Sequence, residues 1–270
     1  MRDVAFGQYY PSNSVLHKAD PRTKLIAGIV YIVAVFLCES YWAYLACFLF
    51  LLIACLVSKV PIKSILKSIK AVLFVVLITV IINIFCYKTG TVLWSWWIFT
   101  VTDGGLIFAS KMAMRLIFLV VSTSLITFTT TPVTLTDGLE SLLTPLKWIK
   151  FPVHDVAIIM SIALRFIPSF TEEIDKIMMA QKARGACFDD GNIFKRAKAL
   201  LPVLIPLFVS AFRRADELAM AMDARCYNAT DKRTKMKRLK FAWRDLFLAL
   251  ATAVFLALII MLKCGFFGLL

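Results

Sequence analysis

The sequence contains none of the short motifs that mark common enzyme sites. It has no G-x-x-x-x-G-K-[ST] stretch, no H-E-x-x-H and no G-x-S-x-G. Those patterns are typical of P-loop nucleotide binding, zinc proteases and serine hydrolases. The only two histidines, His17 and His154, lie near the expected membrane interfaces. We therefore expect no enzyme activity, no catalytic residue, no metal site and no cofactor in this chain.

The seven cysteines also lack a recognisable framework. None belongs to a C-x-x-C pair, and four lie in or beside apolar runs. Such spacing favours neither a zinc site nor a set of disulfides. We expect these cysteines to behave as small buried hydrophobic residues.

Charged residues are scarce as well. They make up 18% of the chain, hydrophobic residues make up 60%, and the mean hydropathy is +0.81. Soluble domains contain about 45–50% apolar residues, so the composition indicates a polytopic membrane protein. Five apolar stretches approach the roughly 17–25 residues that a span needs: Leu25–Cys38, Tyr41–Val57, Ala71–Tyr87, Leu106–Phe128 and Leu246–Leu262. The first reaches this length only if Arg22 and Lys24 extend to the interface.

The net charge of +14 would suggest nucleic acid in a soluble protein, but here the positive-inside rule accounts for it, and no nucleic-acid partner is expected. Basic residues concentrate before the first span, in the 58–70 loop and in region 171–240, which has fifteen Lys/Arg against nine Asp/Glu. Five spans place all three regions on one side when the N-terminus is inside. We therefore expect a cell-membrane protein whose N-terminus and residues 129–240 are cytoplasmic and whose C-terminus is outside.

The expected fold class is an all-α polytopic membrane protein with about five transmembrane helices and a cytoplasmic domain of long amphipathic helices. We predict a cytoplasmic segment (1–24), four spans (25–128), the cytoplasmic domain (129–240) and a final span (241–270). Two apolar stretches of the cytoplasmic domain, Val156–Leu164 and Ala199–Phe212, are too short for spans and are expected at the interface or against protein. Pro168 predicts a helix start and Gly185 a helix stop.

Two basic residues lie inside the fourth predicted span. Lys111 and Arg115 are four residues apart and share a helix face. Charges within the membrane usually face a bundle interior or mark a pathway. Two interpretations remain open: these residues face a partner protein, or Lys111 reaches the outer interface while Arg115 packs structurally.

The cytoplasmic region contains two similar phrases, "AQKARGACF" from Ala180 and "AMDARCYN" from Ala221. Each places an alanine four residues before an arginine, Arg184 or Arg225, and another directly before it. Both could be ordinary basic residues at helix C-termini, where the macrodipole favours them by about 0.3–1 kcal/mol. Alternatively, small neighbours leave each guanidinium accessible to a carboxylate of a dimeric partner.

Several phrases together resemble the transmembrane T component (EcfT) of energy-coupling factor (ECF) transporters, a branch of the ATP-binding-cassette importers. They are "FGQYYP", "LHKADPRTKL", the threonines at 129–131 with a following leucine, "LRFIP", "AQKARG" and "RRADELAMAMDARCY". They occur in family order over most of the chain.

The resemblance implies a subunit that transmits motion and has no chemistry of its own. X-Arg-X motifs at the ends of its coupling helices would dock into two ABC-type ATPase subunits. Motion would pass to small membrane S components that hold a vitamin or trace metal. The docking motifs implied here are Ala183-Arg184-Gly185 and Ala224-Arg225-Cys226, and Cys226 departs from the usual glycine. "FGQYYP" is similar to T components shared among several S components.

Two alternatives stand beside this interpretation. A self-sufficient secondary transporter would need a site at the membrane midplane, but the spans contain no acid suited to ion coupling. A membrane-surface scaffold would use the basic 171–240 region to bind anionic lipid, although nine interspersed acids weaken that attraction. The sequence does not identify a substrate.

Overall fold

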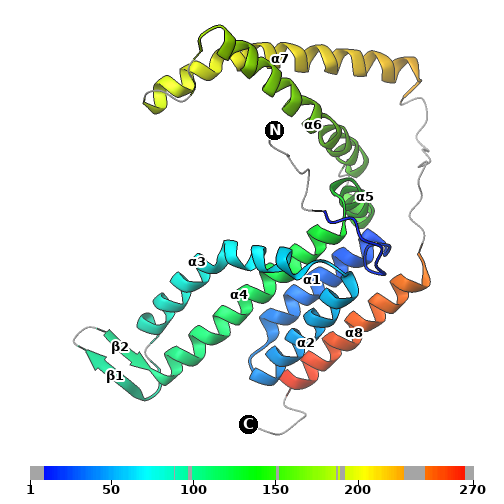
Figure 1. Ribbon diagram of the computed structural model, residues 1–270. Coiled ribbons are helices and arrows are strands. Elements are labelled where there is room, and N and C mark those ends of the chain that lie inside the picture. Colours follow the sequence, from blue (N-terminus) through cyan, green and yellow to red (C-terminus); the bar gives the residue numbers. More distant parts are fainter. Residues whose placement is uncertain are drawn as a thin grey trace. The chain divides into compact units, whose positions relative to one another are not determined.

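The computed structural model describes residues 9–87, 89–96, 99–149, 152–186, 188, 192–227 and 241–264. The chain forms two compact units, one from residues 5–157 and 239–270 and the other chiefly from residues 158–238 (Figure 1). We call the first the bundle unit and the second the arm unit.

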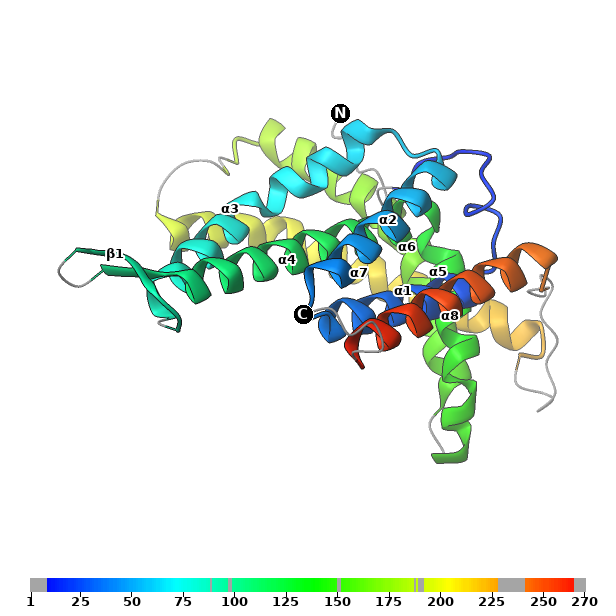
Figure 2. The ribbon, with the colours of Figure 1, turned by 90° about the horizontal axis from the view of Figure 1, so that it is seen from below.

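In its described residues the bundle unit contains the α-helices α1 (Pro21–Leu37), α2 (Tyr41–Ser58), α3 (Ile62–Cys86), α4 (Asp103–Thr129), α5 (Pro132–Leu143) and α8 (Trp243–Lys263), together with the first residues of a longer helix that continues into the arm unit. The 3-10 helix η1 (Thr144–Ile149) follows α5. Figures 1 and 2 both show α1 beside α8 and α3 beside α4. Each of the five predicted spans falls on one of these helices, so the all-α membrane fold is confirmed.

Helix α1 begins at Pro21. The Asp20 side chain caps it by accepting a hydrogen bond of 3.0 Å from the Arg22 backbone N–H, as aspartate before an N1 proline does. Along α1 the side chains of Tyr31, Ala34 and Val35 are buried. α1 contacts α2, α4, α5 and α8, so it is enclosed by protein on several sides.

By length and composition, five helices of the described residues could cross a membrane: α2, α3, α4, α6 (Val153–Ala183) and α8. The number agrees with the prediction, but α6 takes the place of α1. α1 has 17 residues, near the shortest length that spans. α6 has 31 residues because it continues through Pro168, where the sequence predicted that a new helix begins.

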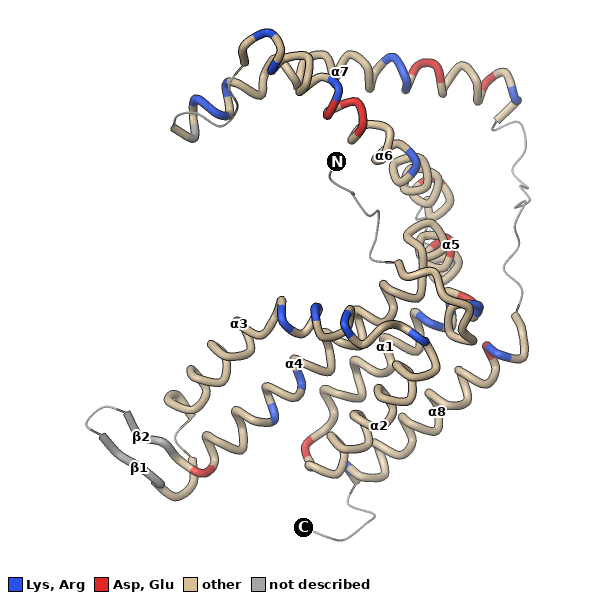
Figure 3. The backbone as a smooth tube through the Cα atoms, in the orientation of Figure 1, with Lys and Arg blue, Asp and Glu red and all other residues tan. Residues whose placement is uncertain are grey.

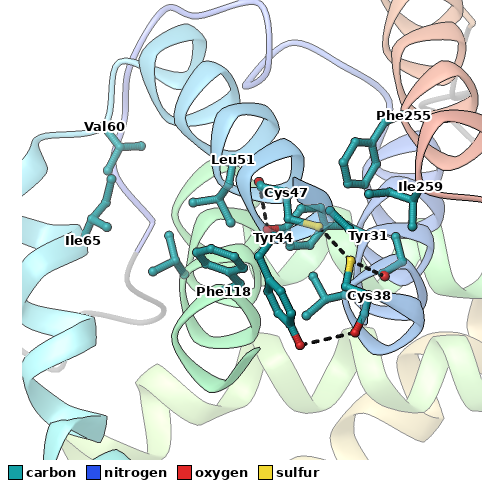
Figure 4. Close-up of a cluster of buried hydrophobic side chains, with 14 of the residues drawn as sticks. Tyr31, Cys38, Tyr44, Cys47, Leu51, Val60, Ile65, Phe118, Phe255 and Ile259 are labelled. Carbon is teal, nitrogen blue, oxygen red and sulfur yellow. Dashed lines mark hydrogen bonds between the residues drawn. The ribbon is translucent and has the colours of Figure 1, made fainter. Parts of the chain in front are cut away.

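The core of the bundle unit joins α1, α2, α4 and α8 (Figure 4). Aromatic rings dominate it: Phe50 stacks on Phe255 with centroids 4.4 Å apart, and Tyr31 lies against both. Cys38 and Cys47 are buried between α1 and α2 as free thiols with sulfurs 3.4 Å apart. The expectation that the cysteines are small buried residues is therefore confirmed for these two, but it is wrong for Cys86, Cys226 and Cys264, which are exposed.

A short hairpin connects α3 to α4. Strand β1 (Val92–Trp96) pairs antiparallel with β2 (Phe99–Thr102). The close return to α4 requires glycine, because a β-carbon at Gly104 would lie 2.3 Å from the Thr89 carbonyl oxygen and one at Gly105 would lie 2.7 Å from that of Tyr87. The sequence analysis did not predict these strands.

The basic stretch predicted as the 58–70 loop is largely helical, since α3 begins at Ile62. Its first turns are amphipathic: Ile65 is buried in the core, whereas Lys63 and Lys67 are exposed. Apolar residues at a helical spacing extend the helix toward its N-terminus, and Figure 3 shows basic positions along these first turns of α3.

The arm unit consists of most of α6 and of α7 (Ile193–Ala224). α6 ends immediately before Arg184, so the helix stop predicted at Gly185 is confirmed. α7 contains Pro202 and Pro206 within the helix, and each removes one helical hydrogen bond.

Candidate functional site

The first arginine phrase forms the C-terminal end of α6. The Gly185 N–H donates to the Lys182 carbonyl at 3.0 Å, and the Ala186 N–H donates to the Gln181 carbonyl at 3.0 Å. These two bonds define a Schellman motif, in which the residue after the C-cap is left-handed. Gly185 has a φ of 87°, so Arg184 is the C-cap residue.

The second arginine phrase ends α7 with the same geometry. The Cys226 N–H donates to the Asp223 carbonyl at 2.9 Å, and the Tyr227 N–H donates to the Met222 carbonyl at 3.0 Å. Cys226 has a φ of 52°. Arg225 is therefore the C-cap residue of a second Schellman motif, equivalent to the first.

The equivalent geometry of the two helix ends shows that Cys226 takes the position that Gly185 takes in the first motif. Cysteine adopts the left-handed conformation that glycine adopts in the first motif, although this conformation costs a residue with a β-carbon about 1–2 kcal/mol. A β-carbon at Gly185 would meet no atom within 4 Å, so only backbone conformation favours glycine there. Arg184 and Arg225 are both exposed, and their small neighbours Ala183 and Ala224 are exposed as well.

Arg214 of α7 forms side-chain contacts with α6. Arg214 donates to the Glu173 carboxylate at 2.6 Å and to the Ser169 hydroxyl at 2.5 Å. Its guanidinium also lies 5.2 Å from the centre of the Phe170 ring. The side chains of Arg214 and Glu173 are 31% and 22% exposed, so water screens this ion pair less than it would a surface pair. Sequence reasoning missed this contact.

The apolar stretches of the arm unit are exposed in this chain. Ile159 and Met160 of α6 are exposed, and so is the series Leu200, Leu201, Leu204, Ile205, Phe208, Val209 and Phe212 of α7. Contiguous exposed apolar surface marks contact with membrane or protein. The expectation that these stretches lie at an interface or against protein stays a prediction, because their partners would be other molecules. The judgement that Val156–Leu164 is too short to be a span is wrong by length and composition, since it belongs to α6, which could cross a membrane.

Lys111 and Arg115 lie on α4 beside the turn between α1 and α2. Arg115 donates to the Cys38 carbonyl and the Tyr44 hydroxyl, both at 3.3 Å, and so satisfies the C-terminal end of α1. The ammonium of Lys111 lies 5.2 Å from the centre of the Tyr41 ring. Figure 3 shows these two basic positions along an otherwise apolar stretch of α4. Arg115 thus has structural contacts within the chain, and a partner-facing role for either residue stays a prediction.

A buried polar cluster at the start of α1 escaped the sequence analysis. Lys24 is 5% exposed, and its ammonium donates to the Thr129 carbonyl at 3.0 Å and to the His17 carbonyl at 3.2 Å. The sequence suggested that the Lys24 side chain extends to a membrane interface, but it is buried within the protein. Asp245 of α8 is 2% exposed and accepts from the Asp20 N–H at 2.6 Å. The sequence feature that could have indicated this cluster is the concentration of charged residues in "ADPRTK", directly before an apolar run.

Burial changes the electrostatic environment of His17, which precedes α1. Desolvation lowers the pKa of its imidazole, and the charge of Lys24 acts in the same direction. The ring nitrogens lie 2.7 Å from the Ser14 hydroxyl and 2.9 Å from the Tyr10 carbonyl. A neutral imidazole donates a hydrogen bond from one ring nitrogen and accepts one at the other, so both contacts suit the neutral form. They join residues of the N-terminal segment to one another.

The part of the chain that the structure describes contains no group of three His, Cys, Asp or Glu residues able to hold a metal ion. The described cysteines are free thiols, and Cys187 lies outside the described residues.

Comparison with known proteins gives a consistent result. The family model described as "Cobalt transport protein" (CbiQ) matches residues 12–236. The energy-coupling factor transporter transmembrane protein EcfT of Ruminiclostridium cellulolyticum is 52% identical over 267 residues, covering 99% of this chain and 100% of that protein. EcfT of Acidaminococcus fermentans is 48% identical over 97% of this chain and 96% of its own length. EcfT of Bacillus subtilis (strain 168) is 41% identical over 99% of this chain and 98% of its own length.

Proposed function

The chain belongs to the CbiQ family, as a T component (EcfT) of energy-coupling factor transporters, and on that premise we propose that it couples two ABC-type ATPases to substrate-binding S components. It is a membrane transporter subunit. In the proposal Arg184 and Arg225 each dock into one ATPase subunit. ATP hydrolysis takes place on those partners, and this chain contributes binding and motion.

The observation that supports docking is the structural equivalence of the two arginine ends. Two helices of one chain finish in the same Schellman motif, with an exposed arginine at the C-cap of each. A single helix end of this kind is ordinary. Two equivalent ends on one unit suit two equivalent sockets, as a dimer of ATPases offers. Arginine suits such a socket because its guanidinium binds a carboxylate with two parallel hydrogen bonds.

The exposed apolar residues of α6 and α7 support the second part of the proposal. They precede the charged ends of the same helices, so each helix would meet the membrane or an S component with one part and an ATPase with the other. The N-terminus and the arm unit would then be cytoplasmic, as the distribution of basic residues predicts. The transported vitamin or metal would be held by the S component.

Charge reversal at both arginines tests the docking role. We expect Arg184→Glu combined with Arg225→Glu to weaken ATPase binding about a hundredfold or more, because two charge-assisted contacts of about 1.5–3 kcal/mol each are lost. Insertion and folding should not change, since both side chains are exposed. The measurement is the amount of ATPase that co-purifies with the tagged chain, together with transport in cells.

The matched control reverses two other exposed arginines of the arm unit, Arg196→Glu with Arg213→Glu. It makes the same change in net charge away from the two helix ends. Equal loss of ATPase in both double variants would indicate non-specific electrostatic attraction. Unchanged co-purification and transport in the Arg184 and Arg225 variant would overturn the docking proposal.

A further inference from the structure

The ion pair joins corresponding positions of two helical segments, residues 173–184 of α6 and residues 214–225 of α7. We call these segments the two arms. Arg184 and Arg225 are forty-one residues apart, and so are Glu173 and Arg214. Each docking arginine therefore follows its own member of the ion pair by eleven residues. Eleven residues make three helical turns, so each arm is about 16 Å long and its arginine returns to nearly the same face of the helix.

The same shift aligns further residues of the two arms. Ser169 corresponds to Ser210, Asp175 to Asp216, Met179 to Met220 and Ala180 to Ala221. Met179 and Met220, each five residues before the docking arginine, are 63% and 64% exposed. The two arms thus have the same length and closely similar exposure, and they share five residues, Asp, Met, Ala, Ala and Arg, between the ion pair and the tip. They carry opposite charges at the pair itself and also where Lys176 corresponds to Glu217 and Lys182 to Asp223.

An attractive contact between charged side chains at corresponding positions of two similar helices requires opposite charges. Two identical charged residues meeting there would repel each other, whereas Glu173 and Arg214 attract at 2.6 Å. The Ser169 hydroxyl and the Phe170 ring hold the same guanidinium from the neighbouring turn of α6. Few other contacts hold α7 against α6, since most of its apolar side chains are exposed.

We propose that the Glu173–Arg214 pair is a strut that fixes the distance between the two docking arginines, so that both engage the ATPase pair at once. This inference rests on the proposed docking function. Glu173 and Arg214 are positioning residues and do not touch the ATPases themselves. Their effect comes from geometry: when one arginine is bound, a fixed spacing gives the second a high effective concentration at its socket. Without the strut, α6 and α7 would sample many spacings and the second contact would be lost.

Charge exchange tests the strut. The variants are Glu173→Arg, Arg214→Glu and the double exchange of both, in the full chain. Each single variant places like charges together, and we expect ATPase co-purification to fall about tenfold or more because double engagement is lost. The double exchange recreates an attractive pair and should restore most of the binding, lacking only the contacts with Ser169 and Phe170. The controls are Glu172→Arg and Arg213→Glu, which make the same charge changes one residue away at exposed positions.

A distance measurement tests the strut without any partner. The native cysteines of the full chain are replaced, and spin labels are attached at Met179→Cys and Met220→Cys. Pulsed electron paramagnetic resonance in lipid nanodiscs then measures the distance between the two labels, and so the spacing of the arms. We expect one narrow distance distribution in the labelled parent, a broad one in each single charge variant and a narrow one again in the double exchange. An unchanged distribution in both single variants would overturn the strut.

The outcomes separate this inference from the docking proposal. If reversal of Arg184 and Arg225 abolishes ATPase binding while the Glu173 and Arg214 variants bind normally, docking holds and the strut is wrong. If the arginine reversals have no effect, docking is wrong, and the strut fails as a docking device whatever the label distances show. If the double exchange does not recover binding or spacing, the effect of the single variants is a general loss of structure, and the strut is again wrong.

Discussion

The bundle unit and the arm unit treat charged residues in opposite ways. In the bundle unit Lys24 and Asp245 are buried, Arg115 is half-buried, and each has hydrogen-bond partners within the chain. In the arm unit Arg184 and Arg225 stand exposed at helix ends. Apolar residues differ in the same way, since α1 buries its central side chains and α7 exposes most of its own. The comparison indicates that these charged residues of the bundle unit bind within the chain, whereas the two exposed arginines of the arm unit are accessible to other molecules. Exposed apolar side chains occur in both units, as α3 shows in the bundle unit.

The buried polar cluster should give the largest effect. We expect Asp245→Ala to destabilise the bundle unit by about 3–5 kcal/mol, because it leaves the Asp20 N–H without its acceptor and removes one of the two negative charges, Asp245 and Asp20, that act on the buried Lys24. The measurement is thermal unfolding of the purified chain in detergent, with membrane yield as a second readout.

The control for this variant is Glu39→Ala. Glu39 is 76% exposed and pairs with Lys263 at 3.3 Å, and exposed pairs of this kind contribute about 0–1 kcal/mol. Similar melting temperatures for Asp245→Ala and Glu39→Ala would show that burial of the cluster does not stabilise the bundle.

Arg115 should come next. We expect Arg115→Met to cost about 1.5–3 kcal/mol, because the Cys38 carbonyl and the Tyr44 hydroxyl lose a charged donor. Lys111→Met should cost about 0.5–1 kcal/mol, since only a cation–π contact with Tyr41 is lost. Melting temperature measures both.

Co-purification of small membrane proteins with the same two variants decides between the two interpretations of these residues. If Lys111→Met removes such a protein without lowering the melting temperature, Lys111 faces a partner. If neither variant changes what co-purifies, both residues have structural roles alone.

The helix ends of the arm unit should give small effects of opposite sign. We expect Gly185→Ala to destabilise the end of α6 by about 1 kcal/mol, and Cys226→Gly to stabilise the end of α7 by a similar amount, because both positions are left-handed. Hydrogen exchange of the amides in each last helical turn measures these changes. Changes of the same sign at both sites would contradict the equivalence of the two motifs.

The sequence predicted the helical membrane fold well because long apolar runs have few alternative structures. It placed the two arginine ends correctly because glycine and the alanine spacing are local signals. It misplaced the start of α3 because the lysines between two apolar runs suggested a loop, and it divided α6 at Pro168 because proline favours the first turn of a helix. The helical pattern of the surrounding residues overrode both signals. It missed the contacts of Lys24 with Thr129 and of Arg214 with Glu173, because each joins residues far apart in the chain.

The sequence by itself determined that this chain is apolar enough for a membrane and that two arginine phrases repeat at a fixed interval. Both properties depend on composition and local spacing, which folding does not alter. Only the tertiary structure decided that Cys226 performs the backbone role of Gly185, and that Arg214 meets the glutamate at its corresponding position. These facts depend on backbone angles and on the packing of α6 against α7, and neither is encoded in any single stretch of residues.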